Sequence, residues 1–193
     1  MKDKKQKKDK HFPNFGLNNP IRRWLDPPER LFGPYLSKGD VVADLGSGPG
    51  YYTFPMADRV GSRGIVYAVD SNEKAIKAIE KRKKRSGISN IKAYACSAHQ
   101  LDFIEDSSVD FVLAEGLFCS IAPNNRDALV KEIQRIMKPD GLAHLSAARG
   151  SISYLTDIDW EEVLKDFEVK KRSDPSPRKG DNWALVTAKG HGR

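Results

Sequence analysis

Residues 41–50 read VVADLGSGPG, an apolar run that is interrupted by an acid and then carries a glycine at every second position. The first five of these residues, VVADL, include four apolar side chains, which is typical of a strand buried on both faces of a parallel sheet. Gly46, Gly48 and Gly50 permit positive φ angles and leave the backbone bare, so that a ligand can lie directly against it. The decapeptide therefore predicts a strand that leads into a small-molecule-binding turn.

The residues that follow add a second strand and a second acid. Residues 51–60 predict the start of a helix whose free N–H groups face the turn. Residues 64–69, GIVYAV, predict a strand that stops at Asp70. An acid at that point is placed to accept hydrogen bonds from both hydroxyls of a ribose. The turn and Asp70 together predict a bound nucleoside.

The spacing of the glycines separates two classes of nucleoside cofactor. Dinucleotide-binding turns read G-x-G-x-x-G, and their third glycine allows close packing of helix on strand. Tyr51 occupies that third position here, which makes a nicotinamide-dependent dehydrogenase the less favoured alternative. The observed G-x-G-x-G, with Asp44 two residues before the first glycine, resembles the signature of class I S-adenosylmethionine-dependent methyltransferases.

This resemblance implies S-adenosylmethionine as the cofactor. Asp44 is expected under the methionine portion, with a structural cap of the glycine turn as the alternative. Glu115, after the fourth expected strand, is expected to hold the methionyl ammonium or to face the sulfonium, with a solvated loop acid as the alternative. The resemblance assigns to the cofactor Asp44, Gly46, Ser47, Gly48, Gly50, Asp70, Ser71, Ser97, Ala98 and Glu115.

One of these positions departs from the family pattern. In relatives the third strand is often followed by G-D-A, whose Asp binds the adenine amino group, and the aligned residue here is Ser97. A serine hydroxyl accepts a hydrogen bond more weakly than a carboxylate does. We therefore expect a weaker adenine contact from Ser97, with the backbone N–H of Ala98 as a second partner.

Hydrophobic patterning over residues 27–189 predicts a single α/β domain. Five strand–helix units are expected, followed by two strands that are joined without a helix and must pair antiparallel. This is the pattern of a Rossmann-like, doubly wound, seven-stranded and mostly parallel sheet with a C-terminal antiparallel hairpin. The expected strands are residues 41–45, 64–69, 91–95, 108–114, 142–147, 167–171 and 183–189.

The connections between these strands carry their own signals. Helical spacing of apolar residues predicts a helix that ends at Ser86-Gly87 and another over residues 125–137. A short helical turn is expected over residues 98–103 and a short helix over residues 158–164. Residues 137–141, MKPDG, resemble the L-K-P-G-G turn of the family and predict a helix stop before the fifth strand.

Most of the net charge of +7 lies at one end of the chain. Residues 1–10 hold six Lys and two Asp, so we expect a disordered Lys-rich tail, followed by an extended segment over residues 11–26. Such a tail raises affinity for anionic partners such as RNA or acidic lipid, or is only a solvated extension. The basic run at residues 81–85 complements the negative end of a helix dipole and needs no partner.

Cysteines, histidines and apolar runs exclude several classes of protein. Cys96 and Cys119 lack C-x-x-C spacing and the four histidines are scattered, so we expect neither a disulfide framework nor a metal site. No segment approaches the ~18 apolar residues of a membrane span. The N-terminus lacks the apolar stretch of a secretory signal, and we expect a cytoplasmic location.

Three functions remain open from the sequence. The first is a methyltransferase that acts on a small-molecule acceptor, and it is the leading hypothesis. The second is an RNA or protein methyltransferase guided by the basic tail. The third is a non-catalytic module that binds S-adenosylmethionine. Methyl transfer from a sulfonium depends mainly on alignment and exclusion of water, so the sequence names no catalytic residue and no oligomeric state.

Overall fold

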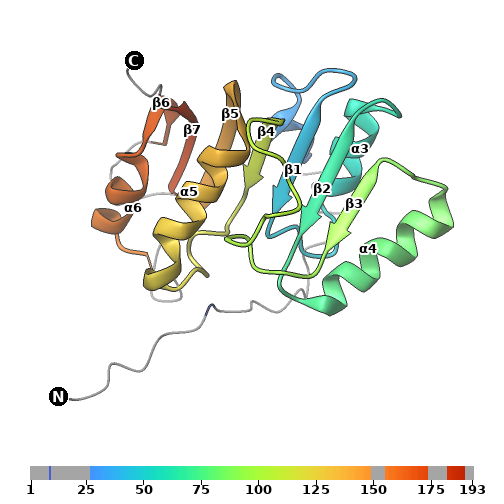
Figure 1. Cartoon of the computed structure of the whole chain (residues 1–193), viewed down its shortest axis with the longest axis horizontal. Helices are drawn as coiled ribbons and strands as arrows, with labels where there is room; N and C mark the ends of the chain where they lie inside the picture. The colour runs from blue at the N-terminus through green and yellow to red at the C-terminus, as the bar shows by residue number, and fades with distance from the viewer. Residues whose placement is uncertain (1–8, 10–26, 149–154, 174–181, 190–193) are drawn as a thin grey trace.

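The computed structural model describes residue 9 and residues 27–148, 155–173 and 182–189 (Figure 1). Seven strands form one sheet in the order β3-β2-β1-β4-β5-β7-β6. The strands are β1 (Val41–Leu45), β2 (Ile65–Val69), β3 (Ile91–Tyr94), β4 (Val109–Ala114), β5 (Met137–Ala147), β6 (Phe167–Arg172) and β7 (Asn182–Ala188).

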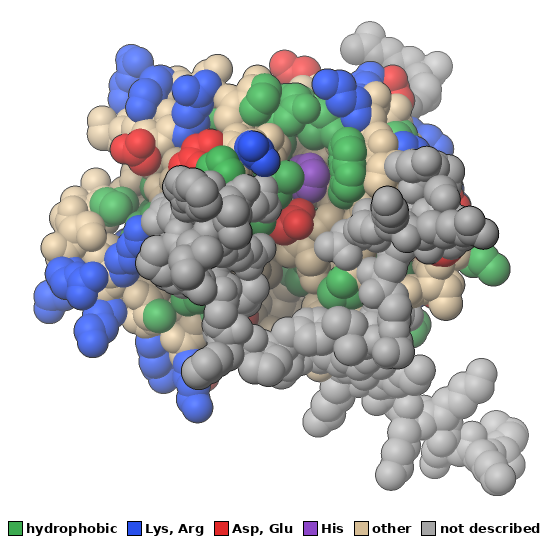
Figure 2. Space-filling model, turned by 180° about the vertical axis from the view of Figure 1, so that it is seen from behind, with side chains coloured by type: hydrophobic (Ala, Val, Ile, Leu, Met, Phe, Trp, Pro, Cys, Tyr) green, Lys and Arg blue, Asp and Glu red, His purple; other side chains and the backbone are tan. Residues whose placement is uncertain are grey.

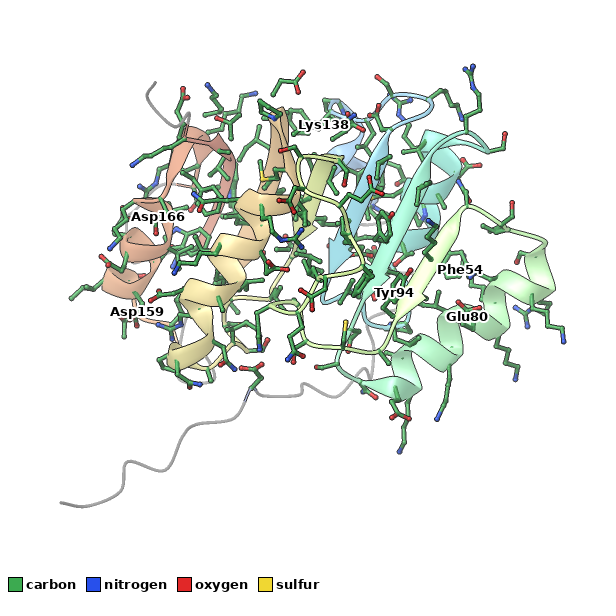
Figure 3. The ribbon with its side chains drawn as sticks, viewed as in Figure 1. Phe54, Glu80, Tyr94, Lys138, Asp159 and Asp166 are labelled. Atoms are coloured by element: carbon green, nitrogen blue, oxygen red, sulfur yellow. The ribbon has the colours of Figure 1, made fainter. Side chains whose placement is uncertain are left out.

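The first five strands are parallel to one another, and β7 runs antiparallel to both of its neighbours. Strand β1 lies between β2 and β4, whereas β7 pairs antiparallel with both β5 and β6. The predicted seven-stranded sheet with its C-terminal antiparallel hairpin is therefore confirmed. The carboxyl ends of the parallel strands meet at one edge, toward which Tyr94 lies in Figure 3, and Lys138 lies at the opposite edge.

Helices cover both faces of the sheet (Figure 1). Helices α5 and α6 pack on one face through a core that includes Leu129, Ile133 and Trp160. Helices α2 and α3 lie on the other face, where Phe32 and Phe54 join a second core. The helices are α2 (Glu29–Phe32), α3 (Thr53–Val60), α4 (Glu73–Ser86), the 3-10 helix η1 (Pro123–Asn125), α5 (Arg126–Ile136) and α6 (Asp157–Leu164).

Both ends of helix α4 are set by capping residues that adjoin it in the sequence. The side chain of Asn72 accepts a hydrogen bond from the backbone N–H of Lys74 and so caps the first turn. Gly87 closes the helix in the left-handed conformation, which confirms the predicted end. Its buried face is apolar, whereas its other face is rich in Lys and Arg, and basic side chains gather at that side of the molecule in Figure 2.

Two connections differ from the prediction. Residues 98–103 form turns and no helix, so the third strand–helix unit lacks its helix. Strand β5 begins at Met137, five residues earlier than expected, because Met137 pairs with Val109 of β4. The register shifts between Val109 and Phe111, so residues 138–141 form an irregular strand segment rather than a turn.

Part of the predicted N-terminal organisation lies outside the described residues. This applies to residues 1–8 and 10–26. Asp9 is described, and its Oδ1 accepts hydrogen bonds from the backbone N–H of Ala122 at 2.8 Å and from the amide of Asn125 at 3.1 Å. The carboxylate of Asp9 thus contacts the chain just before α5.

Candidate active site

The glycine turn follows β1 and is fixed by the end of β2. The backbone N–H groups of Gly46 and Ser47 both donate to the carbonyl of Val69, at 2.8 and 3.0 Å. Gly46, Gly48 and Gly50 have φ angles of 78°, 51° and 89°, a region that side chains disfavour. The backbone of this turn therefore carries no side chain at its three glycines, where β1 and β2 end, as the sequence predicted.

Two of these glycines are also required by close packing. A Cβ at Gly50 would lie 2.7 Å from the ring of Phe54. A Cβ at Gly46 would lie 3.1 Å from Cδ1 of Leu117, which follows β4. The loop after β4 thus packs directly against the glycine turn.

Asp70 stands beside this turn, as the sequence predicted. Its Oδ2 accepts a hydrogen bond from the N–H of Gly48 at 2.8 Å, and its Oδ1 accepts one from the N–H of Asn72 at 2.8 Å. A carboxylate offers about four acceptor positions, so each oxygen retains capacity for one more donor. Two adjacent hydroxyls are the donors that such a pair of oxygens can bind.

Asp44 is buried at the end of β1, with 2% of its surface exposed. Burial raises its pKa to about 7, although the hydroxyl of Thr53 donates to Oδ2 at 2.5 Å and partly opposes this shift. The negative charge of Asp70 also raises the pKa. A cation bound beside Asp44 would favour its ionised form. Sequence reasoning missed Thr53, because a threonine at a helix start gives no specific signal.

Ser47 supplies a further polar group inside the turn. Its side chain is buried, and within the described residues its hydroxyl has no hydrogen-bond partner. A buried hydroxyl without a partner is unfavourable unless a ligand or water binds it. The bare turn, the Ser47 hydroxyl and the Asp70 carboxylate therefore fit a nucleoside-containing ligand.

The end of β3 is aromatic. The rings of Tyr94 and Phe103 stack with centroids 3.8 Å apart and planes at 17°, and Tyr67 lies next to both. Ser97 and Ala98 follow in the turn after this strand, where the carbonyl of Ser97 accepts the N–H of Gln100. The structure thus places both residues at the same edge of the sheet as the glycine turn, whereas their adenine contacts stay a prediction.

Polar side chains meet at the ends of β4 and β5. Oε2 of Glu115 lies 3.1 Å from Nε2 of His144 and accepts the hydroxyl of Ser146 at 2.8 Å. Trp183 of β7 stacks on the ring of His144. Only Glu115 was selected from the sequence. His144 and Ser146 lie in an apolar strand pattern, LAHLSA, in which their alternation could have indicated a shared face.

Two further features are absent from the part of the chain that the structure describes. None of the described helices is long and apolar enough to cross a membrane. Nor do the described residues bring three or more His, Cys, Asp or Glu side chains into an arrangement suited to a metal ion.

Comparison with known proteins relates the chain to methyl-transferring enzymes. A family model described as a methyltransferase domain matches residues 36–184. The demethylmenaquinone methyltransferase of Geobacillus stearothermophilus is 34% identical over 107 residues, which cover 55% of this chain and 44% of the relative. The arsenite methyltransferase of Aquipseudomonas alcaligenes is 28% identical over 145 residues, which cover 69% and 40%. The chain matches less than half of the length of either relative.

A solved structure shares the fold. A methyltransferase from Aquifex aeolicus, described as dependent on S-adenosylmethionine, superposes with a TM-score of 0.73. The match covers 92% of this chain and all of that protein, at 21% identity. The likeness at this identity concerns the arrangement of strands and helices.

Proposed function

Because this chain belongs to the class I S-adenosylmethionine-dependent methyltransferases, whose domain model matches residues 36–184, we propose that it methylates a small-molecule acceptor. The observation that carries the cofactor part of the proposal is the contact between Asp70 and Gly48, which joins the acid expected to bind ribose to the glycine turn. The curated relatives support the class of acceptor, since both are named for small molecules.

The residues of the turn fit this cofactor. Asp70 would accept the ribose hydroxyls, the bare backbone of the glycine turn would contact the methionine portion, and Ser47 would find the partner that its hydroxyl lacks. Asp44, partly neutral in the free protein, would ionise beside a cationic ligand. When bound, S-adenosylmethionine supplies a methyl carbon on a positively charged sulfur.

The contribution of the protein is then mainly geometric. A neutral nucleophile that attacks a sulfonium methyl spreads a charge that is already present, so the site needs alignment and exclusion of water more than new charge. Leu117, packed against Gly46, supplies apolar surface at the turn, and the aromatic pair Tyr94 and Phe103 supplies apolar surface at the end of β3.

For the acceptor we propose an apolar hydroxylated ring, of the kind that a reduced naphthoquinone presents. The match to a demethylmenaquinone methyltransferase and the exposed edge of Trp183 support this choice. Arsenite is the less favoured acceptor, because thiolates are the ligands that soft ions prefer and the sequence holds two cysteines, Cys96 and Cys119.

Calorimetry tests the cofactor assignment. S-adenosylmethionine and S-adenosylhomocysteine should bind the purified protein with one site per chain. The acceptor is then tested with labelled methyl donor and 1,4-naphthalenediol, with arsenite as the alternative acceptor. Absence of binding by either cofactor form at millimolar concentration would contradict the proposed function, whereas binding without turnover of any acceptor would favour the non-catalytic module.

The Lys-rich residues 1–10 keep an RNA or protein acceptor as the second candidate. Affinity for RNA should then fall steeply with salt and on deletion of residues 1–10. If the deletion leaves RNA affinity unchanged, this alternative fails and the small-molecule acceptor stands.

A further inference from the structure

The carboxylate of Glu115 is held by two side chains of the neighbouring strand. The hydroxyl of Ser146 donates to Oε2 at 2.8 Å, and Nε2 of His144 lies 3.1 Å from the same oxygen. The Ser146 hydroxyl in turn accepts the backbone N–H of Gly116 at 2.7 Å. Oε2 of Glu115 thus has two partners, His144 and Ser146. The hydroxyl of Ser146 is itself held by the N–H of Gly116.

His144 is also held from the side. Only 6% of its surface is exposed, and its ring lies parallel to that of Trp183, with centroids 5.8 Å apart and an angle of 9°. The imidazole therefore has little freedom to leave Glu115.

The sheet does not need this arrangement for its own pairing. The backbones of β4 and β5 already pair in register from Phe111 to Ala114, with partners up to Leu145. A buried histidine paired with a carboxylate carries a desolvation penalty that an apolar pair at the same positions would avoid. The polar pair therefore calls for an explanation beyond stability.

The group of Glu115, His144 and Ser146 lies between the positions that we expect for the cofactor and for the acceptor. Strand order places β4 between β1, which carries the glycine turn, and β5, which is followed by β7 with Trp183. Leu117, two residues after Glu115, contacts the turn at Gly46. Glu115 therefore stands between the cofactor turn and the partly exposed indole of Trp183.

We propose that Glu115 is the general base of the reaction and that His144 and Ser146 are positioning residues that fix its carboxylate. The inference rests on the proposed function and names its acceptor more closely, as an aromatic or enolic compound whose hydroxyl loses a proton. A carboxylate that is held within a partly buried polar group can take such a proton as the nucleophile forms.

The proton balance of the step is simple. The acceptor hydroxyl gives its proton to the carboxylate of Glu115, and the electron pair left behind attacks the methyl carbon from the oxygen or, through the ring, from a carbon. The bond from methyl to sulfur breaks, and its electron pair stays on sulfur as a neutral thioether. After attack by carbon, the ring hydrogen leaves as a proton to solvent and restores aromaticity.

Other titratable groups lie near Glu115 and must be separated from it. Among the described residues these are His144 on β5, Cys119 in the same loop, whose thiol donates to the carbonyl of Gly116, and Asp44 on the adjacent β1. A pH profile alone cannot assign the base among them. The test therefore combines the profile with substitutions at Glu115 and at its two partners.

The first experiment uses the full chain, S-adenosylmethionine and 1,4-naphthalenediol. Glu115→Gln should lower kcat by roughly 100-fold and abolish the acidic limb of the pH profile, with the KM for the cofactor within about twofold. Glu115→Asp should recover part of the rate, and the exposed Glu105→Gln is the matched control.

The two positioning residues are tested in the same assay. Ser146→Ala should lower kcat by about tenfold, and Ser146→Thr should restore it. His144→Ala should likewise lose more rate than His144→Gln.

A second readout does not depend on turnover. 4-Nitrocatechol changes its visible spectrum on ionisation, so its protonation can be read when it binds the complex with S-adenosylhomocysteine. In mildly acidic buffer the wild-type complex should bind it as the anion, and the Glu115→Gln complex should bind the neutral form. Thermal unfolding checks that each variant is folded.

Each outcome decides the proposal. Unchanged turnover and spectrum in Glu115→Gln would overturn it, as would a tenfold loss of cofactor affinity at unchanged kcat, which would place Glu115 in the cofactor site. A wild-type protein that binds S-adenosylhomocysteine but neither phenolic probe would overturn it too, while the proposed function would stand. Failure of both cofactor forms to bind would instead contradict the proposed function.

Discussion

The carboxylate of Asp70 accepts the backbone N–H of Gly48 at 2.8 Å, which joins two positions that lie 22 residues apart in the chain. The N–H of Asn72 binds the other carboxylate oxygen. Because two backbone donors fix it, the carboxylate keeps one orientation in the free protein. The group that is expected to bind ribose is therefore preorganised, and less conformational entropy is lost when a ligand binds.

Asp70→Asn should weaken cofactor binding without unfolding the protein. The substitution replaces one acceptor oxygen by a donor, so one ribose hydroxyl loses its charged partner. We expect the Kd for S-adenosylhomocysteine to rise by roughly 10-fold to 100-fold, which corresponds to about 1.5–3 kcal/mol. Isothermal calorimetry measures it. Asp58→Asn, at an exposed position of α3, is the control, and equal affinities for the two variants would refute the role of Asp70.

Asp44 should make the stability of the free protein fall as the pH rises. Burial raises its pKa from 3.8 to about 7 in the folded state, so between these values the folded protein keeps a proton that the unfolded chain has released. The free energy of unfolding should therefore fall by roughly 4 kcal/mol across this interval because of this group. Below the interval the contribution is fully present, and above it the contribution is lost.

Asp44→Asn isolates this effect, because the amide does not ionise and its oxygen can still accept from Thr53. The variant should match the wild type near pH 4 and be more stable than it near pH 8 in urea titrations. Asp58→Asn again provides the control, with no change in slope expected. A stability difference that does not depend on pH would show that Asp44 ionises normally in the folded protein.

The fold was predictable because its signals are local. Apolar runs, the glycine turn and the cap of α4 at Asn72 and Gly87 each lie within a few residues of the structure that they specify. The start of β5 was not predictable in this way. Met137 is a strand residue because it pairs with Val109, 28 residues earlier, whereas the following KPDG has the local composition of a turn.

In the candidate site, too, residues in a local motif were predictable, whereas residues that depend on contacts between elements were not. The positions of Gly46, Gly48 and Asp70 follow from a motif whose parts have fixed spacing. Thr53, His144 and Ser146 act through contacts with acids on other elements, and no spacing rule connects them. The contact between Thr53 and Asp44 depends on how α3 leaves the turn, which a sequence pattern does not specify.

Arg135 should contribute more to stability than a surface arginine. Its guanidinium donates to the carbonyls of Leu101 and Ile104 and pairs with Glu132 and Asp106, so it fastens the segment after β3 to α5. Arg135→Met keeps most of the side-chain volume but removes every donor. We expect a loss of about 2–3 kcal/mol in the free energy of unfolding, measured in urea.

The pH dependence provides a check on this assignment. The hydrogen bond from Arg135 lowers the pKa of Glu132, so the stabilisation is present above the ordinary pKa of a glutamate and is lost as the pH falls through the lowered value. Arg135→Met should therefore lose part of its disadvantage in acid, because the bonds to the carbonyls of Leu101 and Ile104 do not titrate. Exposed Arg63→Met is the control, and a similar loss in both variants would argue against the network.

Gly50→Ala should destabilise the protein more than Gly87→Ala, although both residues have positive φ. Gly87 has φ of 66° and a Cβ there meets nothing within 4 Å, so alanine adds only backbone strain of about 1 kcal/mol. Gly50 has φ of 89°, and its Cβ would lie 2.7 Å from the ring of Phe54 and 3.2 Å from Ile79. Phe54 is packed under Arg82, whose guanidinium carbon lies 3.8 Å from the ring centroid, so the ring cannot yield freely. Overpacking should therefore cost about 1–3 kcal/mol beyond the backbone strain, measured as a loss of free energy of unfolding in chemical denaturation.

Cofactor binding provides a second readout for the same pair of variants. Cofactor affinity should fall in Gly50→Ala and stay unchanged in Gly87→Ala. Equal stability of the two variants would mean that the turn can move away from α3.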